Sequence, residues 1–169
     1  MKDFEILGID IQIIYPTAFA FVSDVEDKDL AAAICRAHNN YVADRCGKAP
    51  DQLKGVAIVP LQDPAAAVEE MRRSLKKLGL VGVTIPGIVE DKPLHSPEFY
   101  PFFKAANELD CQIGFHAVTG MHNTPWADCF KDFFSTHVNA MPFSMMVSLM
   151  SVIRIGDHGD MSESAFCLS

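Results

Sequence analysis

Short apolar segments recur along the chain, and each is nearly continuous instead of alternating with polar residues. They cover residues 9–16, 53–61, 80–87 and 111–118 and are rich in valine and isoleucine. A strand that is buried on both faces has this pattern, which is typical of parallel sheets. We therefore predict four strands of one parallel sheet.

Amphipathic helices are predicted between these strands. Residues 25–46 place acidic side chains near the helix start and repeat apolar side chains at intervals of three and four. Asp63 and Pro64 suit the N-cap and the first position of a second helix, and Ser96 and Pro97 begin a third helix in the same way. The resulting β-α-β-α-β-α-β order fits either a doubly wound α/β sheet or part of a TIM (β/α)₈ barrel.

Length and charge limit the class of protein and its partners. The chain has 169 residues, of which 49% are hydrophobic and 21% charged, and its net charge is −8. This is the composition of one globular domain. The negative charge argues against nucleic acid or an anionic membrane as a partner, and favours a small molecule or another protein. The longest apolar stretch, residues 141–153, is too short to span a bilayer.

The cysteines predict the compartment. The chain has five cysteines, none in a C-x-x-C pair, and its first residues do not read as a secretory leader. We expect free thiols in a reducing cytoplasm.

Histidines are the main candidates for chemistry, because no dinucleotide-binding loop, Walker loop or nucleophile elbow is present. His116 ends the fourth predicted strand, where parallel α/β enzymes place their active sites. His122 is expected beside the same pocket, and His137 on a pocket wall or at the start of a helix. His38 is expected at the surface or between helices, and His95 in a solvent-exposed turn.

Several segments together resemble the amidohydrolase-related (amidohydrolase family 2) proteins, in the branch that contains aminocarboxymuconate-semialdehyde decarboxylase. The most specific is LKGVAIVPLQDPAAAVEEMRRSLKKLGLVGVTIPG, residues 53–87. LGIDIQIIYPT, CRAHNNYVADRC, IGFHAV and THVNAMPFSMMVSLMSVI follow the family pattern in the same order. The resemblance covers residues 1–153.

The resemblance implies a (β/α)₈ barrel, with a divalent metal, usually zinc, at its C-terminal mouth. In this family the metal is held by an H-x-H motif of the first strand, a histidine of the fifth strand, and His and Asp residues of later strands. His116 matches the fifth-strand ligand, and His137 is a second candidate metal ligand. The implied reaction is metal-dependent decarboxylation or hydrolysis of a small carboxylated substrate.

The chain departs from the family at both ends. It corresponds to about strands 2–5 of 8, without the first-strand H-x-H and the later ligands, so we expect it to be inactive alone. Residues 1–153 form the predicted partial barrel domain. The tail, residues 154–169, breaks the family pattern. A back-translation with chosen synonymous codons, read one base later, restores a family-like continuation, so we predict a frameshifted tail.

Two alternatives of other classes remain open at the level of sequence. One is a non-catalytic half-barrel that associates with itself or a partner through exposed sheet edges. The other is a doubly wound α/β module that binds a small ligand near His116. The Met-rich segment 141–153 is apolar nearly all round, so it should be buried in a core or packed on a partner.

Overall fold

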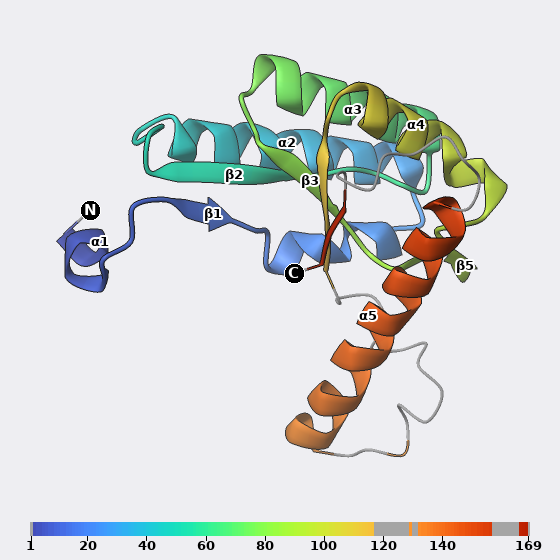
Figure 1. The fold of residues 1–169 in the computed structure, drawn as a ribbon. Coiled ribbons are helices and arrows are strands. Elements are labelled where there is room, and N and C mark those ends of the chain that lie inside the picture. The colour runs from blue at the N-terminus through green and yellow to red at the C-terminus, as the bar shows by residue number, and fades with distance from the viewer. Residues whose placement is uncertain (1, 117–128, 130–131, 157–165, 169) are drawn as a thin grey trace.

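The computed structural model describes residues 2–116, 129, 132–156 and 166–168. Within them, one parallel sheet contains the strands β1, β2, β3, β6 and β7 in that spatial order (Figure 1). Their bounds are Gln12–Ile14, Leu53–Ile58, Gly82–Ile85, Gln112–Phe115 and Phe166–Leu168. The first four are the strands predicted from the apolar segments, each shorter than its segment.

The strand order decides between the two predicted architectures. Each new strand joins the same edge of the sheet, so the spatial order equals the chain order. A doubly wound sheet reverses direction at a switch point and does not have this order. A run of parallel strands added in chain order is the wall of a barrel. The predicted partial barrel is therefore confirmed, and the doubly wound alternative is wrong.

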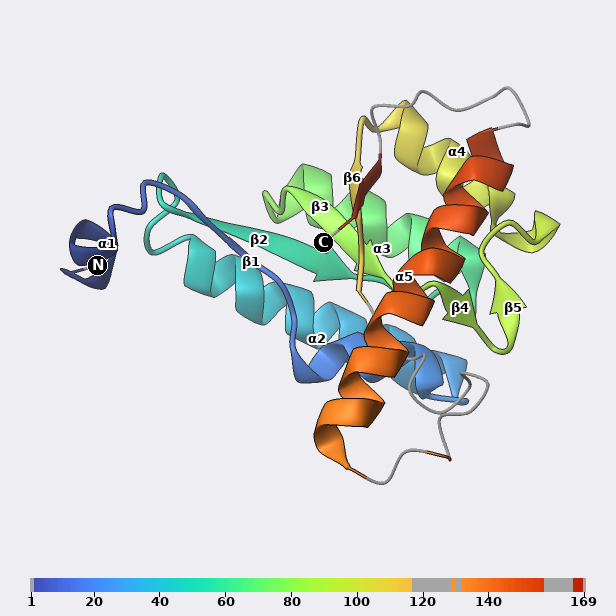
Figure 2. The same ribbon diagram turned by 60° about the horizontal axis from the view of Figure 1, so that its bottom comes forward.

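Three helices cover one face of the sheet (Figures 1 and 2): α2 (Lys28–Cys46), α3 (Pro64–Lys77) and α4 (Tyr100–Glu108). The predicted first helix begins at residue 28 and not 25, because Asp27 is its N-cap and accepts a hydrogen bond from the Leu30 N–H at 3.0 Å. Asp63 caps α3 as predicted, through the N–H groups of residues 65 and 66. The third helix begins with the 3₁₀ turn η2 (Pro97–Phe99).

The core lies between this helical layer and the sheet. Its largest side chains are fully buried, and the rings of Phe102 and Phe103 meet edge to face with centroids 5.4 Å apart. Val83, Ile113 and Phe115 contribute from the strands. Burial of this apolar surface stabilises the strands in the positions that define the carboxyl-terminal edge of the sheet.

Some short elements were not predicted. They are α1 (Lys2–Leu7), the 3₁₀ helix η1 (Ala18–Asp24), and the hairpin of β4 (Ile88–Val89) and β5 (Lys92–Pro93). In the tail, residues 166–168 pair with β6 as β7, although no apolar period marks residues 154–169. Whether this tail arises by a frameshift stays a prediction about the nucleotide sequence.

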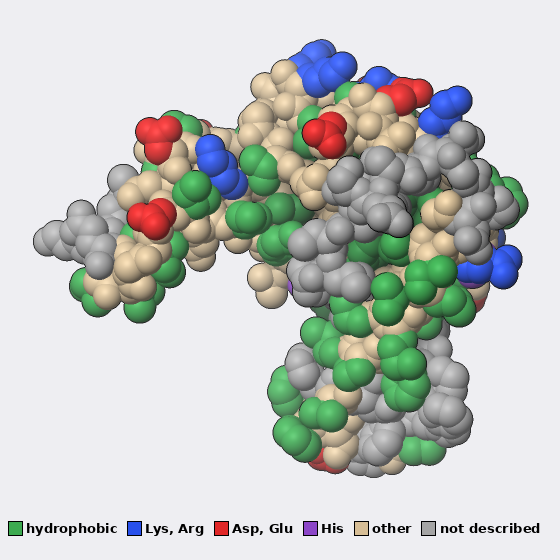
Figure 3. Space-filling model, in the orientation of Figure 1, with side chains coloured by type: hydrophobic (Ala, Val, Ile, Leu, Met, Phe, Trp, Pro, Cys, Tyr) green, Lys and Arg blue, Asp and Glu red, His purple; other side chains and the backbone are tan. Residues whose placement is uncertain are grey.

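The Met-rich segment lies in α5 (Phe133–Gly156), which packs by a row of small side chains. Ser144, Ser148 and Ser151 are buried, and a Cβ atom on Gly87 would overlap the Ser148 hydroxyl. The opposite face is apolar and exposed, as the green side chains along the helix show in Figure 3. It includes Phe133, Phe134, Met146 and Ile153, which are 60–81% exposed.

Of the predicted segment 141–153, Met146 and Ile153 are thus not buried in the core of this chain, and the alternative expectation, packing on a partner, stays a prediction. The sequence pattern misleads because serines, which read as neutral, occupy the packed side of the helix where space is tight. Among the described residues, no helix is both long and apolar enough to cross a membrane.

Candidate functional site

A small hollow lies at the carboxyl ends of β2, β3 and β6, beneath η1. We call it the strand-end hollow. Three polar side chains, Ser23, Thr84 and His116, line it together with apolar residues that include Ile58 and Pro86. Its volume is about 10 Å³. Barrel enzymes build their active sites at this end of the strands.

His116 is held by the sheet although it follows the last residue of β6. Its backbone N–H donates to the Ile85 carbonyl oxygen at 3.0 Å, which extends the pairing of β3 with β6. The register places Gly114 opposite Thr84. Because side chains alternate along a strand, Thr84, Gly114 and His116 share one face of the sheet.

The His116 ring is partly buried, and its Nδ1 atom has no hydrogen-bond partner in the described part of the chain. Burial lowers the pKa of His116 below its ordinary value, because desolvation penalises the charged ring. The neutral imidazole is the form that can bind a metal or accept a hydrogen bond.

Two further polar groups, which the sequence did not single out, face the same hollow. Thr84 and Ser23 are 4% and 6% exposed, and their hydroxyl oxygens are buried without a partner among the described residues. Buried polar groups are nearly always hydrogen-bonded in folded proteins. The one available signal was a threonine in an otherwise apolar strand, VGVTIPG.

Gln62 fixes the segment that carries Ser23. Its buried side-chain amide donates to the carbonyl oxygens of Val22 at 2.6 Å and of Val25 at 2.9 Å, on either side of Ser23. Since Gln62 lies in the loop after β2, it ties η1 to the sheet. Gln62 is thus a positioning residue for the hollow.

Tyr15 fills the same face of the sheet below the hollow. A Cβ atom added to Gly114 would lie 2.8 Å from Cε1 and 2.9 Å from Oη of Tyr15. Only glycine therefore leaves room for the tyrosine ring against β6. The ring comes from the end of β1, so it spans the face of the sheet from one side of the half-barrel toward the other.

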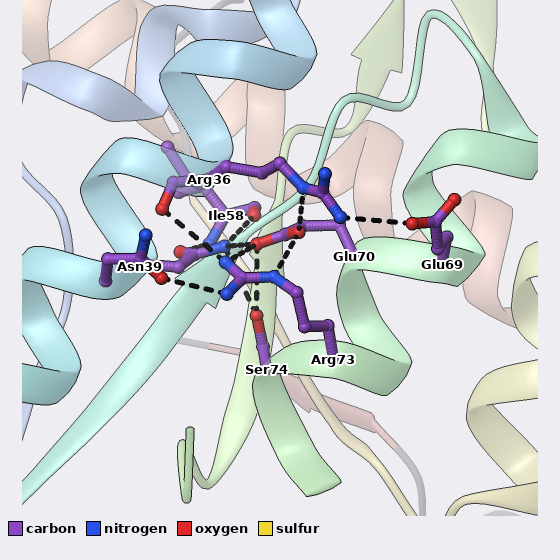
Figure 4. A network of polar contacts seen from close by, with 8 residues as sticks. Arg36, Asn39, Ile58, Glu69, Glu70, Arg73 and Ser74 are labelled. Atoms are coloured by element: carbon purple, nitrogen blue, oxygen red, sulfur yellow. Dashed lines mark hydrogen bonds and ion pairs between the residues drawn. The ribbon is translucent and has the colours of Figure 1, made fainter. Parts of the chain in front are cut away.

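A polar network lies outside the hollow, where it joins α2, β2 and α3 (Figure 4). The buried Glu70 carboxylate accepts hydrogen bonds from Arg73 at 2.7 and 2.8 Å and from Asn39 at 2.8 Å. Burial alone would raise the pKa of Glu70, but these hydrogen bonds and the Arg73 charge outweigh burial and lower it. All its charges are paired within the fold, so the network is a structural support.

The structure places two of the other candidate histidines, His38 and His95, and neither lines the hollow. His122 lies outside the described residues. His137 belongs to α5, but its side chain also lies outside the description. His38 is half-buried in α2, on the helical side of the sheet.

His95 differs from the expectation of a free surface residue. It is half-buried, and its Nδ1 atom lies 3.3 Å from the Ser151 hydroxyl oxygen. It therefore connects the loop after β5 to α5 and has a structural role.

Thiol and metal chemistry are limited by what the described residues bring together. Burial raises the pKa of Cys35 and of Cys111 to about 12, with the Glu70 charge adding to the effect on Cys35. Neither thiol is a nucleophile at neutral pH. In the described part of the chain no three His, Cys, Asp or Glu side chains are grouped to hold a metal ion. His116 could supply one ligand, but one ligand does not make a site.

Comparison with known proteins identifies the family to which this chain is similar. A family model described as Amidohydrolase matches residues 9–150. The chain is 35% identical over 104 residues to a gamma-resorcylate decarboxylase of Rhodococcus jostii, covering 56% of this chain and 32% of that protein. It is 26% identical over 152 residues to a 2-amino-3-carboxymuconate-6-semialdehyde decarboxylase of Dictyostelium discoideum. This match covers 86% of this chain and 39% of that protein. The chain thus spans about a third of the length of these relatives.

Solved structures agree. A 2,6-dihydroxybenzoate decarboxylase complexed with 2,6-dihydroxybenzoate superposes with a TM-score of 0.80 at 25% identity, covering 99% of this chain and 53% of that one. A dihydroxybenzoic acid decarboxylase of Polaromonas, with bound manganese and 2-nitroresorcinol, has the same fold. Its TM-score is 0.75 at 22% identity, and the match covers 99% of this chain and 51% of that one. The strand order, the position of His116 and the match over residues 9–150 agree with the resemblance seen in the sequence: this chain belongs to the amidohydrolase family.

Proposed function

We propose that this chain forms one side of the active-site mouth of a metal-dependent decarboxylase that acts on a small carboxylated substrate. The observation that carries the proposal is the position of His116 at the carboxyl end of β6, where its backbone N–H extends the pairing of β3 with β6. The relatives named for decarboxylation support decarboxylation over hydrolysis.

In this proposal, His116 is the fifth-strand ligand of a divalent metal in a complete barrel. A bound divalent metal supplies Lewis-acid chemistry, which polarises an oxygen of the substrate. Gln62 holds η1, which carries Ser23, over the strand ends, and Tyr15 closes the face below them. Zinc was expected from the family resemblance. Manganese is the better first choice for experiments, because a structural relative contains it.

The described residues do not fit a metal ion without further ligands, as no group of three candidate ligands occurs among them. We therefore propose that the chain by itself is inactive. Equilibrium dialysis against manganese and zinc should show no tight stoichiometric uptake, and 2,6-dihydroxybenzoate should not lose CO₂. Tight binding of one metal ion per chain would overturn this part of the proposal.

The active-site role is tested by a graft. Residues 12–116 replace the matching segment of the Rhodococcus gamma-resorcylate decarboxylase, which keeps its own first and later strands. We expect the graft to release CO₂ from its substrate, and His116→Ala to abolish this release. His95→Ala is the matched control, because His95 bonds to α5 and lies away from the hollow. Equal activity in both variants would contradict the proposal.

A second candidate function is a half-barrel that pairs with another copy of itself. Exposed apolar side chains favour it: Ile11 and Ile13 at β1 are 57% and 55% exposed, and Phe133, Phe134 and Met146 line α5. Large exposed apolar patches commonly mark protein contacts. Sedimentation over a range of concentrations tests it. A monomer at all concentrations would exclude self-association.

A further inference from the structure

Three buried polar atoms converge on the strand-end hollow from three separate segments of the chain. The residues are Ser23 of η1, Thr84 of β3 and His116 after β6, which all line the hollow, and the buried atoms are Ser23 Oγ, Thr84 Oγ1 and His116 Nδ1. None of them has a hydrogen-bond partner within the described residues, so they do not bond to one another. Three side chains that line one small space thus each carry a buried polar atom that is unpaired among the described residues.

The size and chemistry of the hollow indicate what it takes. The hollow measures about 10 Å³, and a buried water needs roughly 10–15 Å³ and two to four polar partners. Two hydroxyls and one imidazole nitrogen supply three partners that can donate or accept. A divalent metal is a poor match for this set, since it contains no carboxylate and no thiolate.

Buried polar atoms that stay without hydrogen-bond partners would destabilise the folded chain. A buried hydroxyl or imidazole nitrogen without a partner destabilises the fold, because it has given up its hydrogen bonds to water, and three residues with such groups line one space. Replacing Thr84 by valine would remove one of them without changing the shape of the side chain. Gln62 holds the Ser23 segment over the hollow by two hydrogen bonds, so collapse of η1 into the hollow is opposed.

We propose that the strand-end hollow binds a single oxygen atom, from a water molecule or from a small hydroxyl compound, through Ser23 Oγ, Thr84 Oγ1 and His116 Nδ1. The bound oxygen fixes the His116 ring and joins η1, β3 and the end of β6 at one point. This site needs neither a metal nor turnover, so it stands or falls separately from the proposed decarboxylase function.

A high-resolution crystal structure of the whole chain tests the proposal. We expect one isolated density peak at roughly 2.7–3.2 Å from each of the three atoms. The peak should disappear in Thr84→Val and in Ser23→Ala. It should remain in Ser74→Ala, where the hydroxyl removed belongs to the Glu70 network. No peak in the wild type, or a peak unchanged in both hollow variants, overturns the proposal.

A solution measurement covers the case in which a variant fails to crystallise. Magnetic relaxation dispersion of water counts long-lived buried waters, and Thr84→Val should lose one relative to wild type and to Ser74→Ala. No loss would overturn the proposal. Crystals soaked in resorcinol distinguish the source of the oxygen: ring density joined to the peak identifies a ligand hydroxyl, and an unchanged round peak identifies water.

Discussion

The side chain of Asn39 pairs with the backbone of Ile58 as a neighbouring strand would. Its Nδ2 donates to the Ile58 carbonyl oxygen at 2.9 Å, and its Oδ1 accepts from the Ile58 N–H at 3.0 Å. β1 pairs with β2 only up to Gly55, so this edge of β2 needs another partner beyond that residue. Asn39 supplies it from α2 and at the same time donates to Glu70.

Removing this amide should destabilise the fold. Asn39→Ala leaves the N–H and C=O of Ile58 and one oxygen of Glu70 short of partners in a buried place, and we expect a loss of about 2–4 kcal/mol. Urea unfolding followed by circular dichroism measures it. The exposed Asn40→Ala, which removes only an acceptor for Arg73, is the control and should cost under about 1 kcal/mol. Equal losses would refute the role of Asn39.

The Glu70 carboxylate should make stability depend on pH in the acid range. Hydrogen bonds and charge lower its pKa in the folded state below the ordinary value of 4.5, despite the opposing effect of burial. Its contribution is therefore complete at pH values above 4.5 and is lost as pH falls toward the lowered folded-state pKa. Unfolding free energies from about pH 7 to pH 3 should fall less in Glu70→Gln than in wild type. Glu69→Gln, at an exposed carboxylate, should retain the wild-type slope.

The contact of Tyr15 with Gly114 predicts that substitutions at these two positions have non-additive effects on the free energy of unfolding. Gly114→Ala places a methyl group against the tyrosine ring and should cost about 1–3 kcal/mol. In the background of Tyr15→Leu, where the ring is absent, the same change should cost much less. A double-mutant cycle of unfolding free energies measures the coupling. Additive effects would show that the ring does not rest on β6.

Alanine substitutions at two nearby isoleucines of α5 should differ in their effect on the free energy of unfolding. Ile155 is 3% exposed and belongs to the core, so Ile155→Ala should cost about 2–4 kcal/mol. Ile153 is 60% exposed, so Ile153→Ala should change the free energy of unfolding by less than about 0.5 kcal/mol. Thermal and urea unfolding check both. A large loss for Ile153→Ala would mean that the outer face of α5 is covered in solution.

Local sequence signals predicted the framework of the half-barrel well. Asp63 and Pro64 mark the start of α3, and the valine-rich runs mark the strands, because caps and buried strands leave short-range patterns. The position of His116 at a strand end was predicted for the same reason. What the pattern left open was the strand order, since it depends on which edge each new strand joins.

The polar lining of the hollow could not be predicted in this way. Ser23 lies in a 3₁₀ helix with no periodic signal, and Thr84 is a single hydroxyl in an apolar run. They line one hollow because the fold brings η1 to the strand ends, where Gln62 bonds to the backbone on both sides of Ser23, more than 30 residues away in sequence. The packing of α5 was missed because its tight contact depends on Gly87 and on small serines, which hydropathy ranks as neutral.

The metal content of the grafted decarboxylase tests the central claim most directly. With residues 12–116 of this chain in place, the purified protein should contain close to one manganese ion per chain after loading and dialysis. His116→Ala should lose that metal while keeping the circular dichroism of the graft, and His95→Ala should retain it. Full manganese content in His116→Ala would contradict the account.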